Sequence, residues 1–382
     1  MKAHVLCGLD RPELYHDILN AKRIGLMTNQ TGIDRMFHPA IDIIHKNYRL
    51  NVLMGVEHGV RGDVQAGEHV DASVDQKTGV PVVSLYGDTR RPSDSLMKEM
   101  DVAVYDIQDV GARFYTYLYS LSYLMEACAK NSVPLVVMDR LNPLGGVQAE
   151  GTILDESLHS FVGEYAIPTR YAMTVGEYAL FVRKHLQLDI DLTIIPLDGW
   201  RRAFYLDDTD TPWVAPSPNC ATLNAALCFI GTCLFEGTNL SEGRGTTQPF
   251  ELVGAPWIDA DKLADAMKKR ALPGVYFRPC TFVPTFSKHH GTLCRGVQMH
   301  VTDRAQADLF ASGLYLLETI RDRHPNDFAF LTPSDGEQYH FDRLLGTMDY
   351  RLGTADADGI LRENRPKVEA FRHDIQSLLL YT

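Results

Sequence analysis

The stretch VLMGVEHGVRGD (residues 52–63) combines the pattern of a buried strand with a polar end. Its first five residues are apolar or glycine, and the apolar run stops at Glu57 and His58. Three similar runs occur in the first half of the chain: RIGLMT (residues 23–28), DVAVYDI (101–107) and VPLVVMD (133–139). Runs without polar alternation favour parallel strands that are buried on both faces.

Segments with the apolar spacing of amphipathic helices separate these runs. They are PAIDIIHKNY (residues 39–48), PSDSLMKEM (92–100) and TYLYSLSYLMEACAKN (116–131), and PVVSLYG (81–87) is a short strand candidate. A further helix, MTVGEYALFVRKHL (173–186), has Thr174 as its N-cap and Glu177 in the capping-box position, and the strand DIDLTIIPL (189–197) follows it. This alternation predicts an α/β fold with a doubly wound, mostly parallel sheet.

After Trp200 the regular alternation of strand and helix patterns ends. DTPWVAPSPN (210–219) is proline-rich, and NLSEGRGTTQPFELVGAPW (239–257) reads as a long loop. The patterns then predict a helix over 259–272, strands within 275–286 and 296–303, and a helix over 306–323. We expect two domains: residues 1–206 with the parallel sheet, and a smaller α+β domain of residues 207–382 that closes a cleft.

Charge and composition exclude several classes of function. The 382 residues carry a formal net charge of −12, which argues against nucleic-acid or anionic membrane partners because phosphate groups need a basic face. No run approaches the roughly 18 apolar residues of a membrane span, and the first residues lack the apolar core of a secretory signal. The seven cysteines form no Cys-x-x-Cys pair, so we expect buried free thiols and a cytoplasmic protein. No oligomeric state is indicated.

Polar residues follow the four strongest strands, at the point where each strand ends. They are Thr28 and Asn29, Glu57 and His58, Asp106, and Asp139 and Arg140. Ligands of open parallel sheets bind outside the carboxyl ends of the strands, so this clustering predicts a site at one edge of the sheet. The alternative is structural: some of these carboxylates cap the next helix or pair with Arg113 and Arg140.

Glu57 is the best catalytic candidate in this cluster. Neighbouring glycines leave room for a ligand, and Arg61 can bind an anionic group bidentately. The apolar strand behind Glu57 favours the neutral form of its carboxyl, which a general acid requires. We expect His58 to hold the loop or to contact substrate rather than to bind a metal.

The turn DIQDVGARFYTY (106–117) offers a second carboxylate after another strand. Asp109 stands three residues after Asp106, and Arg113, Tyr115 and Tyr117 follow. Carboxylates bind hydroxyl groups and aromatic rings stack on sugar rings, so this composition favours a flat hydroxylated ligand. The alternative is that the tyrosines form the apolar face of the next helix.

Two loops of the second half carry further candidate binding residues. PSPN ends in Asn219, and FEGTNLSEGRGTTQPFE (235–251) contains Asn239, Glu242 and Arg244. Loops of this length in a compact domain are usually functional or disordered, and flanking aromatic residues argue against disorder. No phosphate-binding or dinucleotide-binding spacing occurs.

Ten motifs, all in the same order, resemble the exo-acting β-N-acetylmuramidases of the NamZ type. Among them are EHGVRGD, DIQDVGARFYTY, DRLNPLGG, MTVGEYA, PSPN and EGTNLSEGRGTTQPFELVGAPW. The resemblance implies a Rossmann-like amino-terminal half and a smaller carboxyl-terminal lobe with a cleft between them. It also implies release of N-acetylmuramic acid from the non-reducing end of peptidoglycan fragments. It places the catalytic glutamate on Glu57 and implies no metal, nucleotide or other cofactor.

The chain departs from these relatives at several motif positions. Tyr171 and Ala172 stand where His-Gly is usual, and Val56 and Leu141 stand where proline is usual. Cys220-Ala221 replaces Met-Pro. The change at Tyr171 can alter substrate preference if the histidine of the relatives contacts sugar. Many relatives are exported, whereas this chain shows no signal.

Glycosidases normally use two carboxyl groups, although the 2-acetamido group of this substrate can also act as nucleophile. We predict Glu57 as general acid, with Asp106 or Asp109 as its partner and Glu242 as a weaker candidate. Arg61, Arg113 or Arg244 is expected to bind the lactyl carboxylate of the sugar. The full set of predicted binding residues is Asn29, His58, Arg61, Arg113, Tyr115, Asp139, Asn219, Asn239, Glu242 and Arg244.

Two other functions fit the same residues. One is a non-catalytic protein that binds muropeptides or other sugars. The other is a metal-dependent hydrolase that uses Glu57, His58, Asp106 and Asp109.

Overall fold

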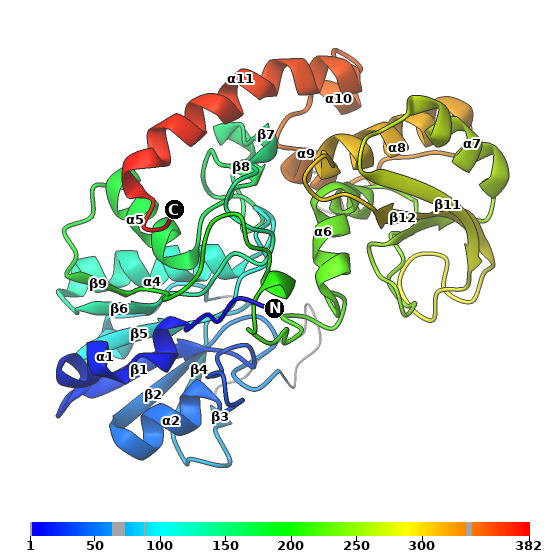
Figure 1. The fold of residues 1–382 in the computed structure, drawn as a ribbon. Coiled ribbons are helices and arrows are strands. Elements are labelled where there is room, and N and C mark those ends of the chain that lie inside the picture. Colours follow the sequence, from blue (N-terminus) through cyan, green and yellow to red (C-terminus); the bar gives the residue numbers. More distant parts are fainter. Residues whose placement is uncertain (1, 63–72, 88, 334–337) are drawn as a thin grey trace.

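A twisted sheet with helices on both faces forms the first half of the molecule (Figure 1). The computed structural model describes residues 2–62, 73–87, 89–333 and 338–382. Within these ranges the sheet has seven strands in the order β3-β4-β2-β1-β5-β6-β9, and all pairs are parallel except β3 with β4. The strands are β1 (Arg23–Thr28), β2 (Arg49–Gly55), β3 (Ser73–Val74), β4 (Pro81–Ser84), β5 (Val102–Asp106), β6 (Leu135–Met138) and β9 (Leu192–Ile195).

Successive strand residues face opposite sides of this sheet. Leu26 packs with helices on one face, and its neighbour Met27 packs with helices on the other. The first face is covered by α1 (Pro12–Leu19) and α2 (Ala40–Asn47), and the second by α3 (Asp94–Met97), α4 (Tyr117–Asn131) and α5 (Val175–His185). Both faces of the sheet are therefore buried, which explains the unbroken apolar runs of the strands. This confirms the predicted doubly wound sheet.

The chain order of the parallel strands reverses beside β1. From β1 the chain moves outward through β2 to β4, and it then returns to the other side of β1 for β5, β6 and β9. This is the Rossmann strand order, and its ligand position lies at the carboxyl ends of the strands where the order reverses.

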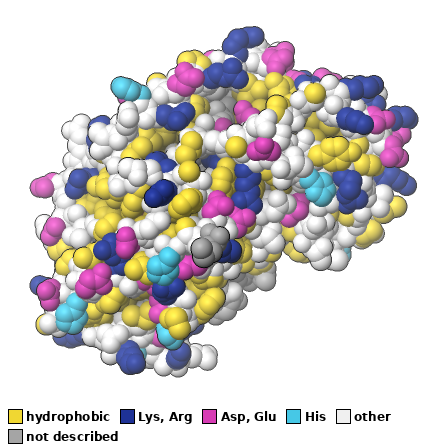
Figure 2. All heavy atoms as spheres, viewed as in Figure 1, with side chains coloured by type: hydrophobic (Ala, Val, Ile, Leu, Met, Phe, Trp, Pro, Cys, Tyr) yellow, Lys and Arg dark blue, Asp and Glu magenta, His cyan; other side chains and the backbone are white. Residues whose placement is uncertain are grey.

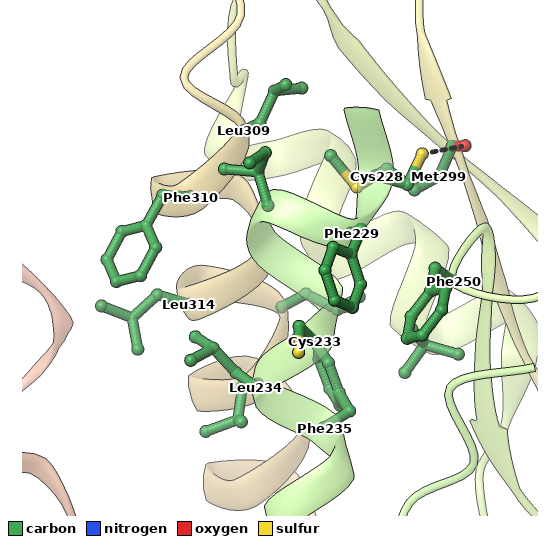
Figure 3. Close-up of a cluster of buried hydrophobic side chains, with 14 of the residues drawn as sticks. Cys228, Phe229, Cys233, Leu234, Phe235, Phe250, Met299, Leu309, Phe310 and Leu314 are labelled. Carbon is green, nitrogen blue, oxygen red and sulfur yellow. Dashed lines mark hydrogen bonds between the residues drawn. The ribbon is translucent and has the colours of Figure 1, made fainter. Parts of the chain in front are cut away.

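A smaller lobe packs around a three-stranded antiparallel sheet, and its mixture of helices and strands confirms the α+β class predicted for the second half. Its elements are β10 (Leu252–Ala255), β11 (Val275–Phe282), β12 (Cys294–Val301), α6 (Leu223–Thr232), α7 (Ala260–Arg270), α8 (Leu309–Arg323), α9 (His340–Leu345) and α10 (Asp349–Leu352). Figure 3 shows part of its core, where α6 packs against α8 and the Phe229 ring of α6 faces the Phe250 ring at a centroid distance of 4.6 Å. The Sγ of Cys228 on α6 lies 3.7 Å from the Met299 carbonyl oxygen on β12.

The last helix returns from the smaller lobe to the first half. α11 (Ala357–Ile375) begins in the core of the smaller lobe with Ala357 and Ile360, and it ends with Phe371 and Ile375 in the core that covers the parallel sheet (Figure 1). It also runs beside β7 (Glu150–Ile153), which pairs with β8 (Pro168–Arg170) in a small antiparallel sheet. On the face seen in Figure 2, acidic and basic side chains are interspersed.

Candidate functional site

The loops that follow β1, β2 and β5 meet at the reversal point of the sheet. Tyr117, after β5, donates a hydrogen bond from its hydroxyl to the Pro216 carbonyl oxygen at 2.7 Å. Gln30, after β1, donates from Nε2 to the same oxygen at 3.0 Å. The PSPN segment, which includes the buried Asn219, is therefore brought against the strand ends.

Glu57 follows β2 directly and is half-buried. The Tyr86 hydroxyl donates a hydrogen bond to Glu57 Oε1 at 3.0 Å, and the Thr116 hydroxyl donates to Oε2 at 2.9 Å. Thr116 occupies the N-cap position of α4, yet its side chain makes no capping hydrogen bond. Its hydroxyl instead orients the carboxylate, so residues from the loops after β4 and β5 hold the side chain of Glu57 in one position.

His58 turns the chain sharply after Glu57. It is buried and has a φ of 72°, in the left-handed region that side chains rarely adopt. Gly59 also has a positive φ, and its amide donates to the Val56 carbonyl oxygen at 3.0 Å. This tight turn is what presents Glu57 at the sheet edge.

Asp106 and Asp139 are engaged by protein donors. Arg140 donates to both oxygens of Asp106, from Nε at 2.6 Å and from Nη2 at 2.9 Å. Asp139 accepts hydrogen bonds from the Thr174 hydroxyl at 2.9 Å, from the Gly176 amide at 2.7 Å and from the Tyr381 hydroxyl. Both carboxylates are fully buried. The geometry favours the structural alternative for both residues over the catalytic or binding roles considered from the sequence.

Asp109 is buried but only partly satisfied. Its Oδ2 accepts hydrogen bonds from the Gly111 amide at 2.8 Å and from the Tyr171 hydroxyl, whereas Oδ1 has no hydrogen-bond partner among the described residues. Burial raises the pKa of Asp109 to about 7, and hydrogen bonds from Tyr171 and from the backbone of Gly111 and Val110 oppose this rise. A carboxyl with this pKa can hold or release a proton near neutral pH.

Tyr171 was singled out in the sequence as a departure from relatives, but its contact with Asp109 could not be foreseen. The neighbouring Ala172 has a φ of 57°. Glycine adopts this left-handed conformation at no steric cost, whereas Ala172 holds it with a β-carbon.

The three arginines expected to bind the lactyl carboxylate all have protein partners. Arg61 pairs with Asp75 at 2.7 Å and with Asp42 at 3.0 Å. Arg244 pairs with Glu236 at 2.6 Å and with Glu242 at 3.3 Å.

Arg113 is fully buried, and burial lowers its pKa to about 10. Its guanidinium donates to the Leu344 carbonyl oxygen at 3.0 Å. Arg113 therefore ties the loop after β5 to the end of α9.

The remaining predicted binding residues are spread over different environments. Asn29 Oδ1 accepts hydrogen bonds from the Thr31 amide and hydroxyl and so shapes the turn after β1. Tyr115 packs edge-on against Tyr117 and is half-buried near the loop that holds Glu57. In the smaller lobe, Asn239 bridges the backbone at Asp327 and Ala329, and Glu242 pairs with Lys288 at 2.7 Å. The structure thus brings Asn29, Glu57, Tyr115 and Asn219 toward one edge, while Asn239 and Glu242 are bound within their own lobe.

Among the described residues, no group of three or more His, Cys, Asp or Glu side chains has an arrangement that could hold a metal ion. No helix in the described ranges is both long and apolar enough to cross a bilayer.

The strand order and the oriented glutamate define an α/β protein with a polar site at the carboxyl edge of a Rossmann-like sheet. Comparison with known families makes this more specific. The model for "Exo-beta-N-acetylmuramidase NamZ, N-terminal" matches residues 24–224, and the corresponding C-terminal model matches residues 227–381. The chain belongs to the NamZ family of exo-β-N-acetylmuramidases, which confirms the resemblance read from its motifs.

Individual relatives agree with this assignment. The peptidoglycan β-N-acetylmuramidase NamZ of Bacillus subtilis (strain 168) is 47% identical over 388 residues, which cover 100% of this chain and 92% of that protein. A DUF1343 family protein from Bacteroides fragilis NCTC 9343 has a crystal structure that superposes with a TM-score of 0.91 at 33% identity, over 99% of both chains. A second such protein from the same organism gives a TM-score of 0.76 at 30% identity, also over 99% of both chains.

Proposed function

We propose that this protein is an exo-acting glycoside hydrolase that releases N-acetylmuramic acid from the non-reducing end of peptidoglycan fragments, with Glu57 as the general acid. The observation that carries the proposal is the Glu57 carboxylate, half-exposed at the end of β2 and oriented by two hydroxyls, in a chain 47% identical to a named muramidase. A general acid must reach the oxygen of the leaving group, and exposure at the strand end suits that task.

Asp109 is the second carboxyl group in this proposal. Both oxygens of Asp106 are held by Arg140, whereas Asp109 keeps one oxygen without a partner among the described residues. Its pKa of about 7 allows it to exchange a proton in the pH range where the general acid must be protonated again. Product stereochemistry distinguishes a base function of this carboxylate, which inverts the anomeric configuration, from the retaining routes in which a carboxylate or the acetamido group of the substrate is the nucleophile.

Glu57→Gln tests the central assignment. The variant can keep hydrogen bonds to Tyr86 and Thr116 but has no acidic proton. We expect kcat/KM for a MurNAc–GlcNAc disaccharide to fall by about 10²- to 10⁴-fold. The loss should be smaller for a 4-nitrophenyl muramide, because nitrophenolate leaves without protonation. Glu126→Gln, at an exposed ion pair with Arg91, is the matched control and should behave like the wild type.

Several results would reject the proposal. Equal losses on both substrates, or no loss, would remove Glu57 from the role of general acid. Saturable binding of the disaccharide without hydrolysis by the wild type would favour the sugar-binding alternative. Activity that EDTA abolishes and a divalent ion restores would favour the metal-dependent hydrolase. Proton NMR of the released sugar reports the anomeric outcome in the same experiment.

A further inference from the structure

The proposed substrate carries a negative charge that the site must accommodate. N-Acetylmuramic acid has a lactyl carboxylate, and the chain itself has a net charge of −12. A cation close to Glu57 is therefore needed to offset repulsion of the ligand. Arg61 and Arg244 already pair with carboxylates, and Arg113 is fully buried.

Arg90 is a cation near Glu57 that forms no ion pair with an acidic side chain in the described part of the chain. It is exposed, and its guanidinium carbon lies 4.2 Å from the centre of the Phe161 ring. Among the described residues, none forms a salt bridge with Arg90. The aromatic face holds the guanidinium in place, and the N–H groups at the ring edge can donate to a bound anion.

The adjacent Arg91 also stacks on an aromatic ring, but it forms an ion pair with a glutamate. Its guanidinium carbon lies 4.0 Å from the centre of the Tyr123 ring, and it pairs with Glu126 at 2.5 Å. The two arginines thus share aromatic stacking, and among the described residues only Arg91 is paired with a carboxylate. Arg91 is for this reason a matched control for Arg90.

A chain of contacts connects Arg90 with Glu57. The Phe161 ring that carries Arg90 lies 6.2 Å, centre to centre, from the ring of Tyr86. The Tyr86 hydroxyl in turn donates to Glu57 at 3.0 Å. Burial and the charge of Glu57 raise the pKa of Tyr86, and the charge of Arg90 opposes this rise, which places the guanidinium within electrostatic reach of the Tyr86 hydroxyl.

We propose that Arg90 binds the lactyl carboxylate of the terminal N-acetylmuramic acid, with Phe161 and Tyr86 as the wall between this carboxylate subsite and Glu57. The inference rests on the proposed muramidase function and names the residue that selects its substrate. A guanidinium binds a carboxylate through two parallel hydrogen bonds, which a neutral or esterified lactyl group cannot accept with the same strength. Arg90 is a specificity-determining residue in this scheme and takes no part in bond cleavage.

The test compares two substrates in three proteins. The substrates are the 4-nitrophenyl β-glycoside of N-acetylmuramic acid and the same compound with its lactyl carboxylate methylated. The wild type should prefer the free acid by roughly 10-fold or more in kcat/KM, mainly through KM, as expected for a charge-assisted hydrogen bond at an exposed site. Arg90→Gln should bring this preference close to one, and Arg91→Gln should keep the wild-type preference.

The outcomes separate the inference from the function on which it rests. If the wild type hydrolyses neither compound nor the natural disaccharide, the proposed function fails and the inference falls with it. If the wild type hydrolyses the free acid and Arg90→Gln retains the full preference over the ester, the function stands and the inference is overturned. Loss of the preference in Arg91→Gln as well would also overturn it, since stacking alone would then explain the effect. An unchanged thermal unfolding midpoint in both variants confirms that each is folded.

Discussion

Burial and the Tyr171 hydroxyl have opposite effects on the pKa of Asp109. Burial raises the pKa of Asp109 to about 7, and the hydrogen bond from Tyr171 opposes the rise because it stabilises the ionised carboxylate. Tyr171→Phe removes that donor, so the pKa of Asp109 should increase further. The limb of the pH–kcat/KM profile that reports Asp109 should therefore move to higher pH. This holds whether activity requires the protonated or the ionised form.

A second tyrosine provides the control for this experiment. The Tyr178 hydroxyl contacts the Ser122 hydroxyl at 2.9 Å, so Tyr178→Phe should leave the profile in place. Asp109→Asn should remove the limb altogether. A limb that stays at the same pH in Tyr171→Phe would mean that a different group titrates there.

Position along a strand predicts where a side chain lies, but not what it binds. Glu57 could be found from the sequence because it ends an apolar strand, and the strand fixes its place at the sheet edge. The partners of Arg61 and of Arg140 depend on loops that only the tertiary structure brings together. Arg90 gave no signal in the sequence, since the Phe161 ring that distinguishes it lies far along the chain.

The start of α5 is the clearest case of an element set by its own sequence. The Thr174 hydroxyl accepts a hydrogen bond from the Glu177 amide at 3.2 Å, and Glu177 accepts one from the Thr174 amide at 2.9 Å, as the capping box predicts. The same hydroxyl donates to the buried Asp139. Thr174→Ala should therefore lower the free energy of unfolding by about 2 kcal/mol, at the upper end of N-cap effects. Urea unfolding measures the change.

Serine at the same position separates the hydroxyl from the methyl group. Thr174→Ser keeps both hydrogen-bonding functions and should lose only a few tenths of a kcal/mol, on the order of other conservative cap changes. A loss in Thr174→Ser as large as in Thr174→Ala would assign the effect to packing of the methyl group instead.

Strands and helices could be predicted where their burial imposes a recognisable spacing of apolar residues in the sequence. Elements without such a spacing could not be predicted. The strands β1, β5 and β6 lie within the predicted runs because burial on both faces demands continuous apolar sequence. α6 went unassigned because LNAALCFIGT is apolar almost all round and has no amphipathic period, as suits a helix buried on most sides. α11 also went unassigned; it contains Pro366, which normally signals a helix end.

At the scale of the whole molecule, the end of the chain completes the core of its beginning. Phe371 and Ile375 of α11 pack into the cluster that covers the parallel sheet. Beyond them, the Tyr381 hydroxyl donates to Asp139, and the Leu380 amide donates to Glu177 at 2.8 Å. The predicted domain of residues 1–206 therefore includes buried groups whose partners come from the predicted domain of residues 207–382.

This arrangement predicts that residues 1–206 do not form a stable domain alone. Loss of the two apolar side chains removes about 1.5–3 kcal/mol each, and loss of the hydrogen bonds from Tyr381 to Asp139 and from Leu380 to Glu177 removes about 1.5–3 kcal/mol each, as is usual for bonds to charged groups. The sum is comparable with the 5–15 kcal/mol that stabilises a typical domain.

The isolated fragment should unfold at lower urea than the full chain, with a broadened transition in near-ultraviolet circular dichroism. Rejoining residues 356–382 to the fragment through a flexible linker should restore a sharp transition. The same fusion with Phe371→Ser and Ile375→Ser in the rejoined segment should not restore it. A fragment that unfolds as sharply as the full chain without the added helix would show that the sheet is stable by itself, and the return of α11 would then serve only to fix the smaller lobe against it.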